Sequence, residues 1–310
     1  MNFFTFIAFL VSPLLTQVAN AHSAPTSFAY LLQADSLSKR KLVFIEQVAA
    51  CGRDWIVLDE AFGGDEAWAR ADLDAIRRGQ AERKVIAYIS IGEAEDYRPY
   101  WRREWGMRKN LTAAAPAWLG VENPKWRGNY RVKYWHADWQ KIMLATIDDA
   151  MAHGFDGVYL DIVDGFETFE QEGKGFIDER VNPETKQSYR RDMVDLVIAI
   201  AARARAKNPA ALIIPQNGSQ LLAHRDFLAV INAIGIEDLF TDGNKLQNKS
   251  HTSEVLNHLK EMSAVQKPVL LIEYPKSAER QALSKKLAKE NGMVFLVTDR
   301  QLRTLGMSGR

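Results

Sequence analysis

Two carboxylates in this sequence stand where they could act together. Asp161 follows directly after Tyr159 and Leu160, and Glu237 follows directly after Ile236, so each ends a short apolar run. An acidic residue after a strand often caps the next helix, but these two still lie within the length expected of their strands. Carboxylates about 5 to 9 Å apart can cleave a glycosidic bond, because one protonates the leaving oxygen while the other attacks the anomeric carbon or activates water.

The elements that must position these residues repeat along the chain. Apolar runs of strand length alternate with amphipathic stretches of helical length, and they comprise residues 28–32, 55–58, 84–89, 157–162, 212–215, 234–236, 268–274 and 293–298. Continuous apolar character predicts strands buried on both faces, as in parallel sheets. Eight such units predict an α/β fold, a single closed (β/α)8 TIM barrel, with an open doubly wound sheet as the alternative.

Strand parity in such a barrel favours the same carboxylate pair. Side chains from alternate strands form one layer inside the barrel, so strands four and six can present Asp161 and Glu237 together. Two strand spacings separate the backbones by about 9 to 10 Å, and inward side chains shorten the carboxyl separation toward the range above. Other strands also end in polar residues at the same rim, among them Asp59, Asn217 and Tyr274.

Two helix boundaries carry local signals. Asn182 before Pro183 predicts an N-cap followed by proline at the first helical position. Asp138 is expected to cap a second helix, which Gly154 ends.

Residues 97–135 interrupt the repeat and predict a long aromatic-rich loop insertion after strand three. They hold five of the eight Trp residues, and Trp139 follows just beyond. Sugar rings stack their C–H faces on aromatic side chains. We therefore expect substrate-facing roles among Trp118, Trp126, Tyr130 and Trp135, which lie between charged and polar neighbours.

Composition excludes several other classes of protein. With 40 Lys+Arg against 39 Asp+Glu the net charge is +1, which gives no bulk attraction to nucleic acid or anionic lipid. The single cysteine, Cys51, can form neither an internal disulfide nor a cysteine-rich zinc site. Nucleotide-binding glycine motifs and the G-x-S-x-G elbow are missing, and no cofactor is predicted. Carboxylates at Asp59, Asp161 and Asp164 leave a Mg²⁺ or Ca²⁺ site open.

The N-terminus has the pattern of a signal peptide. Residues 3–15 are almost wholly apolar, no charged side chain appears before Asp35, and Ala19-Asn20-Ala21 forms an A-x-A cleavage site. The apolar run falls short of the about 20 residues that span a bilayer, although an uncleaved anchor is the alternative. We therefore expect a signal peptide over residues 1–21, a barrel domain over residues 22–310, and a periplasmic or extracellular location.

Two longer stretches indicate a family. Residues 87–98 read A-Y-I-S-I-G-E-A-E-D-Y-R and residues 154–161 read G-F-D-G-V-Y-L-D, and shorter matches include Pro215-Gln216-Asn217-Gly218, Gly235-Ile236-Glu237 and Glu273-Tyr274. From about residue 28 to residue 299 the chain resembles glycoside hydrolase family 114.

The resemblance implies an exported endo-α-1,4-polygalactosaminidase acting on a galactosamine-containing polysaccharide. The family's catalytic carboxylates match Asp161, as nucleophile of a retaining reaction, and Glu237, as acid/base. A cationic amino sugar would also give the carboxylates at the rim a partner. The substrate-binding residues expected on this basis are Asp59, Tyr88, Glu93, Asp96, Trp126, Asp164, Asn217 and Tyr274.

Two hypotheses from other classes stay open at this point. One is an exported carbohydrate-binding barrel without catalysis, and the other is a hydrolase that uses a metal held by Asp59, Asp161 and Asp164. The sequence predicts no nucleic-acid partner, no stable membrane insertion after cleavage of the leader, and no obligate protein partner.

Overall fold

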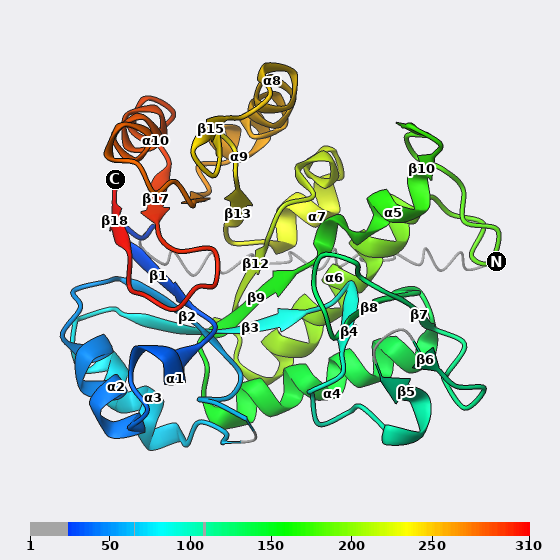
Figure 1. The fold of residues 1–310 in the computed structure, drawn as a ribbon, viewed down its shortest axis with the longest axis horizontal. Coiled ribbons are helices and arrows are strands. Elements are labelled where there is room, and N and C mark those ends of the chain that lie inside the picture. The colour runs from blue at the N-terminus through cyan, green and yellow to red at the C-terminus, as the bar shows by residue number, and fades with distance from the viewer. Residues whose placement is uncertain (1–23, 65, 108–109) are drawn as a thin grey trace, which may run out of the picture.

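Eight parallel strands form the centre of the molecule (Figure 1). The computed structural model describes residues 24–64, 66–107 and 110–310, so the expected signal peptide lies outside the described residues. The strands match the eight predicted runs to within one residue at either end. They are β1 (Phe28–Leu31), β2 (Trp55–Asp59), β3 (Lys84–Ser90), β9 (Gly157–Asp161), β12 (Leu212–Pro215), β13 (Ile234–Glu237), β16 (Val269–Glu273) and β17 (Val294–Val297).

The strands belong to two hydrogen-bonded sheets that meet at two seams. The first sheet has the order β1-β2-β3-β9-β12, and the second has the order β13-β16-β17-β18, with β18 (Met307–Gly309) antiparallel to β17. At one seam Gln216 forms a parallel bridge with Gly235. At the other seam β17 contacts β1, and the Phe28 N–H donates to Ser308 Oγ at 2.9 Å. The fold is the predicted α/β barrel.

Side chains alternate between the inside of the barrel and the helical layer. Those inside include Tyr30, Val57, Ile86, Tyr159, Ile214, Ile272 and Leu296, and those outside include Leu31, Ile56, Val85, Leu160, Ile213 and Leu271. Burial on both faces explains why the runs read as continuously apolar. The same alternation directs Asp161, Gln216 and Glu237 inward, because each follows an inward residue by two positions.

Helices cover the outside of the barrel (Figure 1). The α-helices are α1 (Ala34–Leu37), α2 (Lys41–Ala49), α3 (Arg70–Arg77), α4 (Ala137–His153), α5 (Glu167–Glu170), α6 (Tyr189–Lys207), α7 (Arg225–Val230), α8 (Lys249–His258), α9 (Lys260–Ala264) and α10 (Ala278–Glu290). The 3-10 helices are η1 (Arg103–Trp105), η2 (Val163–Phe166) and η3 (Ser219–Ala223). Within the described residues, none of these helices has the length and apolar character needed to cross a membrane.

One predicted helix start is displaced by six residues of sequence and the other by two. Helix α6 begins after Ser188, whereas Asn182 lies in a preceding turn and donates to the buried Asp192 at 2.7 Å. The Asn182 side-chain oxygen does accept from the Glu184 N–H at 2.9 Å, but the segment that follows closes into a turn and does not continue as a helix. Helix α4 is capped by His136, whose ring accepts from the Asp138 N–H at 3.2 Å, and it ends at Gly154 as predicted.

The insertion after β3 is a small layer of antiparallel strands. It consists of β4 (Glu93–Glu95), β5 (Gly106–Met107), β6 (Asn110–Leu111), β7 (Leu119–Glu122) and β8 (Asn129–Val132), with β4, β8 and β7 in one sheet.

Most aromatic residues of this insertion pack against one another rather than facing a substrate. Trp118 and Tyr130 are fully buried, so the expectation that they face the substrate is wrong. The Trp118 ring lies 4.9 Å from that of Trp139, and the Trp135 ring lies 4.9 Å from that of Phe169. The aromatic residues of the insertion therefore extend the core between the barrel and its helices, which a composition argument cannot separate from a binding surface.

Candidate active site

Asp161 and Glu237 lie on either side of one glutamine amide. Gln216 Nε2 donates to Asp161 Oδ1 at 3.1 Å and to Glu237 Oε2 at 2.8 Å. Gln216 is only 3% exposed and lies at the seam between β12 and β13. The amide nitrogen faces both carboxyl groups and can donate one N–H to each.

The shared nitrogen limits the distance between the two carboxyl groups. Their bonded oxygens lie 3.1 and 2.8 Å from the same atom, so they cannot be more than about 6 Å apart. Two amide N–H bonds diverge by about 120°, which gives a separation of about 5 Å. Retaining glycosidases have about 5 to 5.5 Å between their carboxyl groups, and inverting ones about 6.5 to 9.5 Å.

Three residues that we expected to bind substrate contact Asp161 or Glu237. Tyr88 Oη donates to Asp161 Oδ2 at 2.6 Å, and Tyr274 Oη donates to Glu237 Oε1. Asn217 Oδ1 accepts from the backbone N–H of Glu237 at 3.1 Å. The two tyrosines restrict the rotamers of the carboxyl groups and Asn217 holds the backbone of Glu237, so Tyr88, Asn217 and Tyr274 are placed to position the pair.

The surroundings raise the pKa values of both carboxyl groups. Burial and the negative charge of Asp161 together raise the pKa of Glu237 to about 8, although the hydrogen bond from Tyr274 opposes this. Burial also raises the pKa of Asp161, but hydrogen bonds from Tyr88 and from the Ile162 N–H lower it. Near neutral pH Glu237 is therefore the group that keeps a proton. Two carboxyl groups with separated pKa values can divide the roles of acid and nucleophile.

The backbone turns sharply after each of the three central residues. Ile162, Asn217 and Asp238 follow Asp161, Gln216 and Glu237, and all three have left-handed φ values of 56°, 59° and 51°. A β-branched residue such as isoleucine is rarely found there. The turn lets the Ile162 N–H donate to Asp161 Oδ1 at 2.8 Å. The strained backbone after the strand ends thus helps to orient the carboxylate of Asp161.

Gly235 leaves room for an inward tyrosine beneath the pair. A Cβ atom at this position would lie 1.8 Å from Tyr159 Oη. Any side chain here would displace the Tyr159 ring from the layer below Asp161 and Glu237. The glycine is thus required by packing and not by a turn.

A cavity of about 420 Å³ extends from Glu237 across the ends of β9, β12 and β13. Six of its lining residues are carboxylates, namely Asp164, Glu167, Glu170, Asp178, Glu237 and Glu254. Arg190 also lines it and pairs with Glu170 and Asp178 at 2.8 and 2.6 Å. Burial raises the pKa of Asp164 well above its ordinary value, with Glu167 adding to the effect. The cavity is therefore acidic, and Asp164 lies in it as expected.

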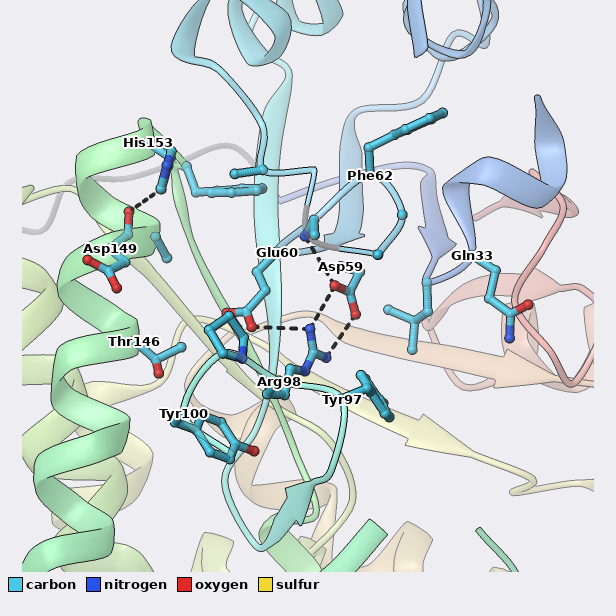
Figure 2. Close-up of a pocket in the computed structure, with 18 of the residues that line it drawn as sticks. Gln33, Asp59, Glu60, Phe62, Tyr97, Arg98, Tyr100, Thr146, Asp149 and His153 are labelled. Carbon is cyan, nitrogen blue, oxygen red and sulfur yellow. Dashed lines mark hydrogen bonds and ion pairs between the residues drawn. The ribbon is translucent and has the colours of Figure 1, made fainter. Parts of the chain in front are cut away.

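Asp59 belongs to a different and larger cavity of about 720 Å³, which Figure 2 shows. Arg98 donates to both oxygens of Asp59 at 2.8 Å and to Glu60 at 3.1 Å, and it pairs with Glu95 at 2.5 Å. Burial raises the pKa of Glu60 to about 7, although the Arg98 charge opposes this. Neither Asp161 nor Glu237 lines this cavity.

The remaining expected residues lie in the insertion. Glu93 is buried on β4 and accepts from Asn123 at 2.8 Å. The backbone N–H of Asp96 donates to Gly128 at 2.8 Å. Trp126 lies in the turn between β7 and β8 and is 45% exposed. Asp96 and Trp126 line neither of the two cavities.

The donor set does not fit the metal hypothesis. A site made by Asp59, Asp161 and Asp164 requires the three to converge, but Arg98 occupies both oxygens of Asp59. Within residues 24–64, 66–107 and 110–310, no group of three or more His, Cys, Asp or Glu side chains could hold a metal ion.

Sequence reasoning missed Gln216 and Arg98 as contributors to the arrangement. Gln216 could have been found by parity, because it follows the inward Ile214 by two positions and ends a strand between strands four and six. Arg98 carried no such signal. Its carboxylate partners are distant in sequence, apart from Glu95.

Comparisons with known proteins find relatives in sequence. The model of glycoside-hydrolase family GH114 matches residues 64–309. An uncharacterized protein of Methanocaldococcus jannaschii is 36% identical over 266 residues, which cover 84% of this chain and 70% of that protein.

Solved structures share the fold. The glycoside hydrolase domain of PelA from Pseudomonas aeruginosa superposes with a TM-score of 0.63 at 18% identity, covering 92% of this chain and 99% of that one. Aspergillus fumigatus Ega3 in complex with galactosamine gives a TM-score of 0.62 at 18% identity, covering 92% and 93%.

Proposed function

The chain belongs to glycoside hydrolase family GH114 and is a glycosidase, and from this premise we propose its substrate, mechanism and location. It cleaves an α-1,4-linked, galactosamine-containing polysaccharide outside the cytoplasm by a retaining mechanism. The observation that carries the mechanism is the Gln216 amide, which contacts both Asp161 and Glu237 and limits their separation.

Asp161 is the nucleophile and Glu237 the acid/base. In the first step an Asp161 oxygen bonds to the anomeric carbon while the glycosidic C–O bond breaks, and Glu237 gives its proton to the leaving oxygen. In the second step Glu237 takes a proton from water, the water oxygen bonds to the anomeric carbon, and Asp161 leaves as a carboxylate. The raised pKa of Glu237, about 8, supports its role as the acid of the first step.

Acidic residues beside Glu237 support a cationic amino sugar as substrate. Asp164, Glu167 and Glu254 line the 420 Å³ cavity and pair with no lysine or arginine of the described chain. The ammonium group of a de-N-acetylated galactosamine would pair with such carboxylates. The bound galactosamine in the Ega3 structure, a relative in fold, supports the same choice.

Export rests on the apolar leader, with cleavage after Ala21. Sequencing of the N-terminus of the secreted protein tests it: a mature chain that begins at His22 is expected. A chain that keeps Met1 would favour the uncleaved anchor.

The activity is tested by product release from de-N-acetylated and acetylated α-1,4-galactosamine polymers, with chelator present. We expect the wild type to release oligosaccharides from the de-N-acetylated polymer, and Asp161→Asn and Glu237→Gln to lose at least about 1,000-fold in kcat. Binding without release by the wild type would favour a non-catalytic carbohydrate-binding protein.

The stereochemistry needs a separate measurement. Nuclear magnetic resonance of the first product should show the α-anomer before mutarotation, because two inversions restore the starting configuration. A β-anomer would refute the nucleophilic role of Asp161.

A further inference from the structure

A large aromatic side chain stands exposed at the edge of the acidic cavity. Phe176 is 61% exposed and lines the cavity together with Glu237. It lies on a hairpin of two short antiparallel strands, β10 (Gln171–Glu172) and β11 (Gly175–Phe176), which follows α5 and projects from the body of the molecule (Figure 1). Single exposed apolar residues are common on protein surfaces, but this ring also lines a cavity, where it can contact a bound molecule.

The base of this hairpin is fixed to the barrel. The Ile177 N–H donates to the Glu170 carbonyl at 2.9 Å. Arg190 on α6 donates to the Glu170 carboxylate at 3.0 and 2.8 Å and to Asp178 at 2.6 Å. These contacts bracket Phe176 on both sides in sequence. The ring is therefore held at the cavity and does not belong to a free tail.

The other walls of the cavity complement an amino sugar. Helix α8 contributes His251, Glu254 and Val255 to the lining, and the segment that follows β9 contributes Asp164 and Glu167. A hexosamine ring has an apolar C–H face that can stack on a phenyl ring and an ammonium group that pairs with carboxylates. One wall thus suits the carbon face of the ring, and the rest of the cavity suits its charge.

The cavity lies on the side of the catalytic acid. Glu237 lines it, whereas Asp161 does not. In the mechanism proposed above, Glu237 protonates the oxygen of the departing sugar chain, so that chain must lie next to this carboxyl group. We propose that Phe176 is the aromatic wall of a subsite for an amino sugar of the leaving-group half of the substrate. The inference rests on the proposed function.

Two substrates separate this subsite from the chemistry. The first is the de-N-acetylated α-1,4-galactosamine polymer, which has sugars on the leaving-group side. The second is a 4-nitrophenyl glycoside of a galactosamine trisaccharide, which has no sugar there. Phe176→Ala should lower kcat/KM for the polymer about 5- to 10-fold, mostly by raising KM. The same variant should change kcat/KM for the aryl glycoside less than about twofold.

Two further variants control the experiment. Phe176→Tyr keeps a stacking ring and should retain wild-type kcat/KM on the polymer. Leu42→Ala removes an apolar side chain that is 70% exposed on α2, which does not line the cavity. It should leave kcat/KM unchanged for both substrates. Unchanged polymer kinetics in Phe176→Ala, or an equal loss on both substrates, would overturn the subsite.

A binding measurement keeps the test independent of turnover. The affinity of a galactosamine tetrasaccharide, measured by calorimetry with Glu237→Gln as the background, should fall about 5- to 10-fold when Phe176→Ala is added. Equal affinities would refute the subsite even if the polymer is cleaved. If the wild type cleaves no polymer while Phe176→Ala still weakens binding, the proposed function fails and the subsite stands.

Discussion

Replacement of Gln216 by methionine tests whether one amide positions both catalytic carboxyl groups. Methionine has nearly the same shape and fills the same buried space, so the fold should lose less than about 1.5 kcal/mol. The variant loses one hydrogen bond to ionised Asp161 and one to protonated Glu237. A bond to a charged group contributes about 1.5 to 3 kcal/mol and a neutral one about 1 kcal/mol.

The two lost hydrogen bonds hold carboxyl groups that must be aligned in the transition state. We therefore expect a decrease in kcat of roughly 100-fold, which corresponds to about 3 kcal/mol. The lost donor had favoured the ionised form of Asp161, so the pKa of Asp161 should rise. The acidic limb of the pH profile of kcat/KM should move upward by about 0.5 to 1 unit.

The assay is the initial rate of reducing-end release across a pH series, with unfolding curves to verify the fold. Gln281→Met is a matched control, because Gln281 is a half-buried glutamine on α10 whose side chain donates to the backbone carbonyl of Pro275 at 3.1 Å. It should change neither rate nor profile. A folded Gln216→Met variant with kcat within about twofold of wild type and an unshifted acidic limb would refute the positioning role.

Three further predictions concern pH, charge and packing. The pKa of Glu237 is raised to about 8, so the native state keeps a proton that the unfolded state releases above about pH 4.5. The free energy of unfolding should therefore fall as the pH rises from about 5 to about 8.5, and it should fall less in Glu237→Gln. Thermal unfolding at each pH measures both. Arg98→Met leaves buried carboxylates without a cation and should lower the free energy of unfolding in urea by about 3 to 5 kcal/mol. Arg303→Met removes one partner of an exposed ion pair and should lower it by less than about 1 kcal/mol. Gly235→Ala should lower the free energy of unfolding by about 2 to 4 kcal/mol in the same assay. Adding Tyr159→Phe should restore part of this loss, because it removes the oxygen that the new Cβ would meet. If the effects of the two substitutions are fully additive, the contact between the two positions is contradicted.

The barrel could be predicted from the sequence because each strand is buried on both faces. Such strands read as continuous apolar runs, and all eight runs match strands. The parity argument then placed Asp161 and Glu237 in one layer, and the structure brings them within reach of one amide.

The insertion and the cavities could not be predicted in the same way. Trp118 and Tyr130 lie among polar residues in the sequence, but antiparallel pairing of β4, β7 and β8 turns them into a buried core. Asp59 ends a strand as Asp161 does, yet it pairs with Arg98, which is distant in the sequence. Local sequence gives the period of each element, whereas these outcomes depend on contacts between elements that no periodicity encodes.

The position of the seam has a consequence for how the enzyme becomes active. Asp161 belongs to the first sheet and Glu237 to the second, and Gln216 lies where the two meet. Neither half-barrel alone holds both catalytic groups, so a refolding chain gains activity only when its halves dock. Recovery of turnover during refolding should therefore follow the last cooperative step and lag behind the recovery of helical signal.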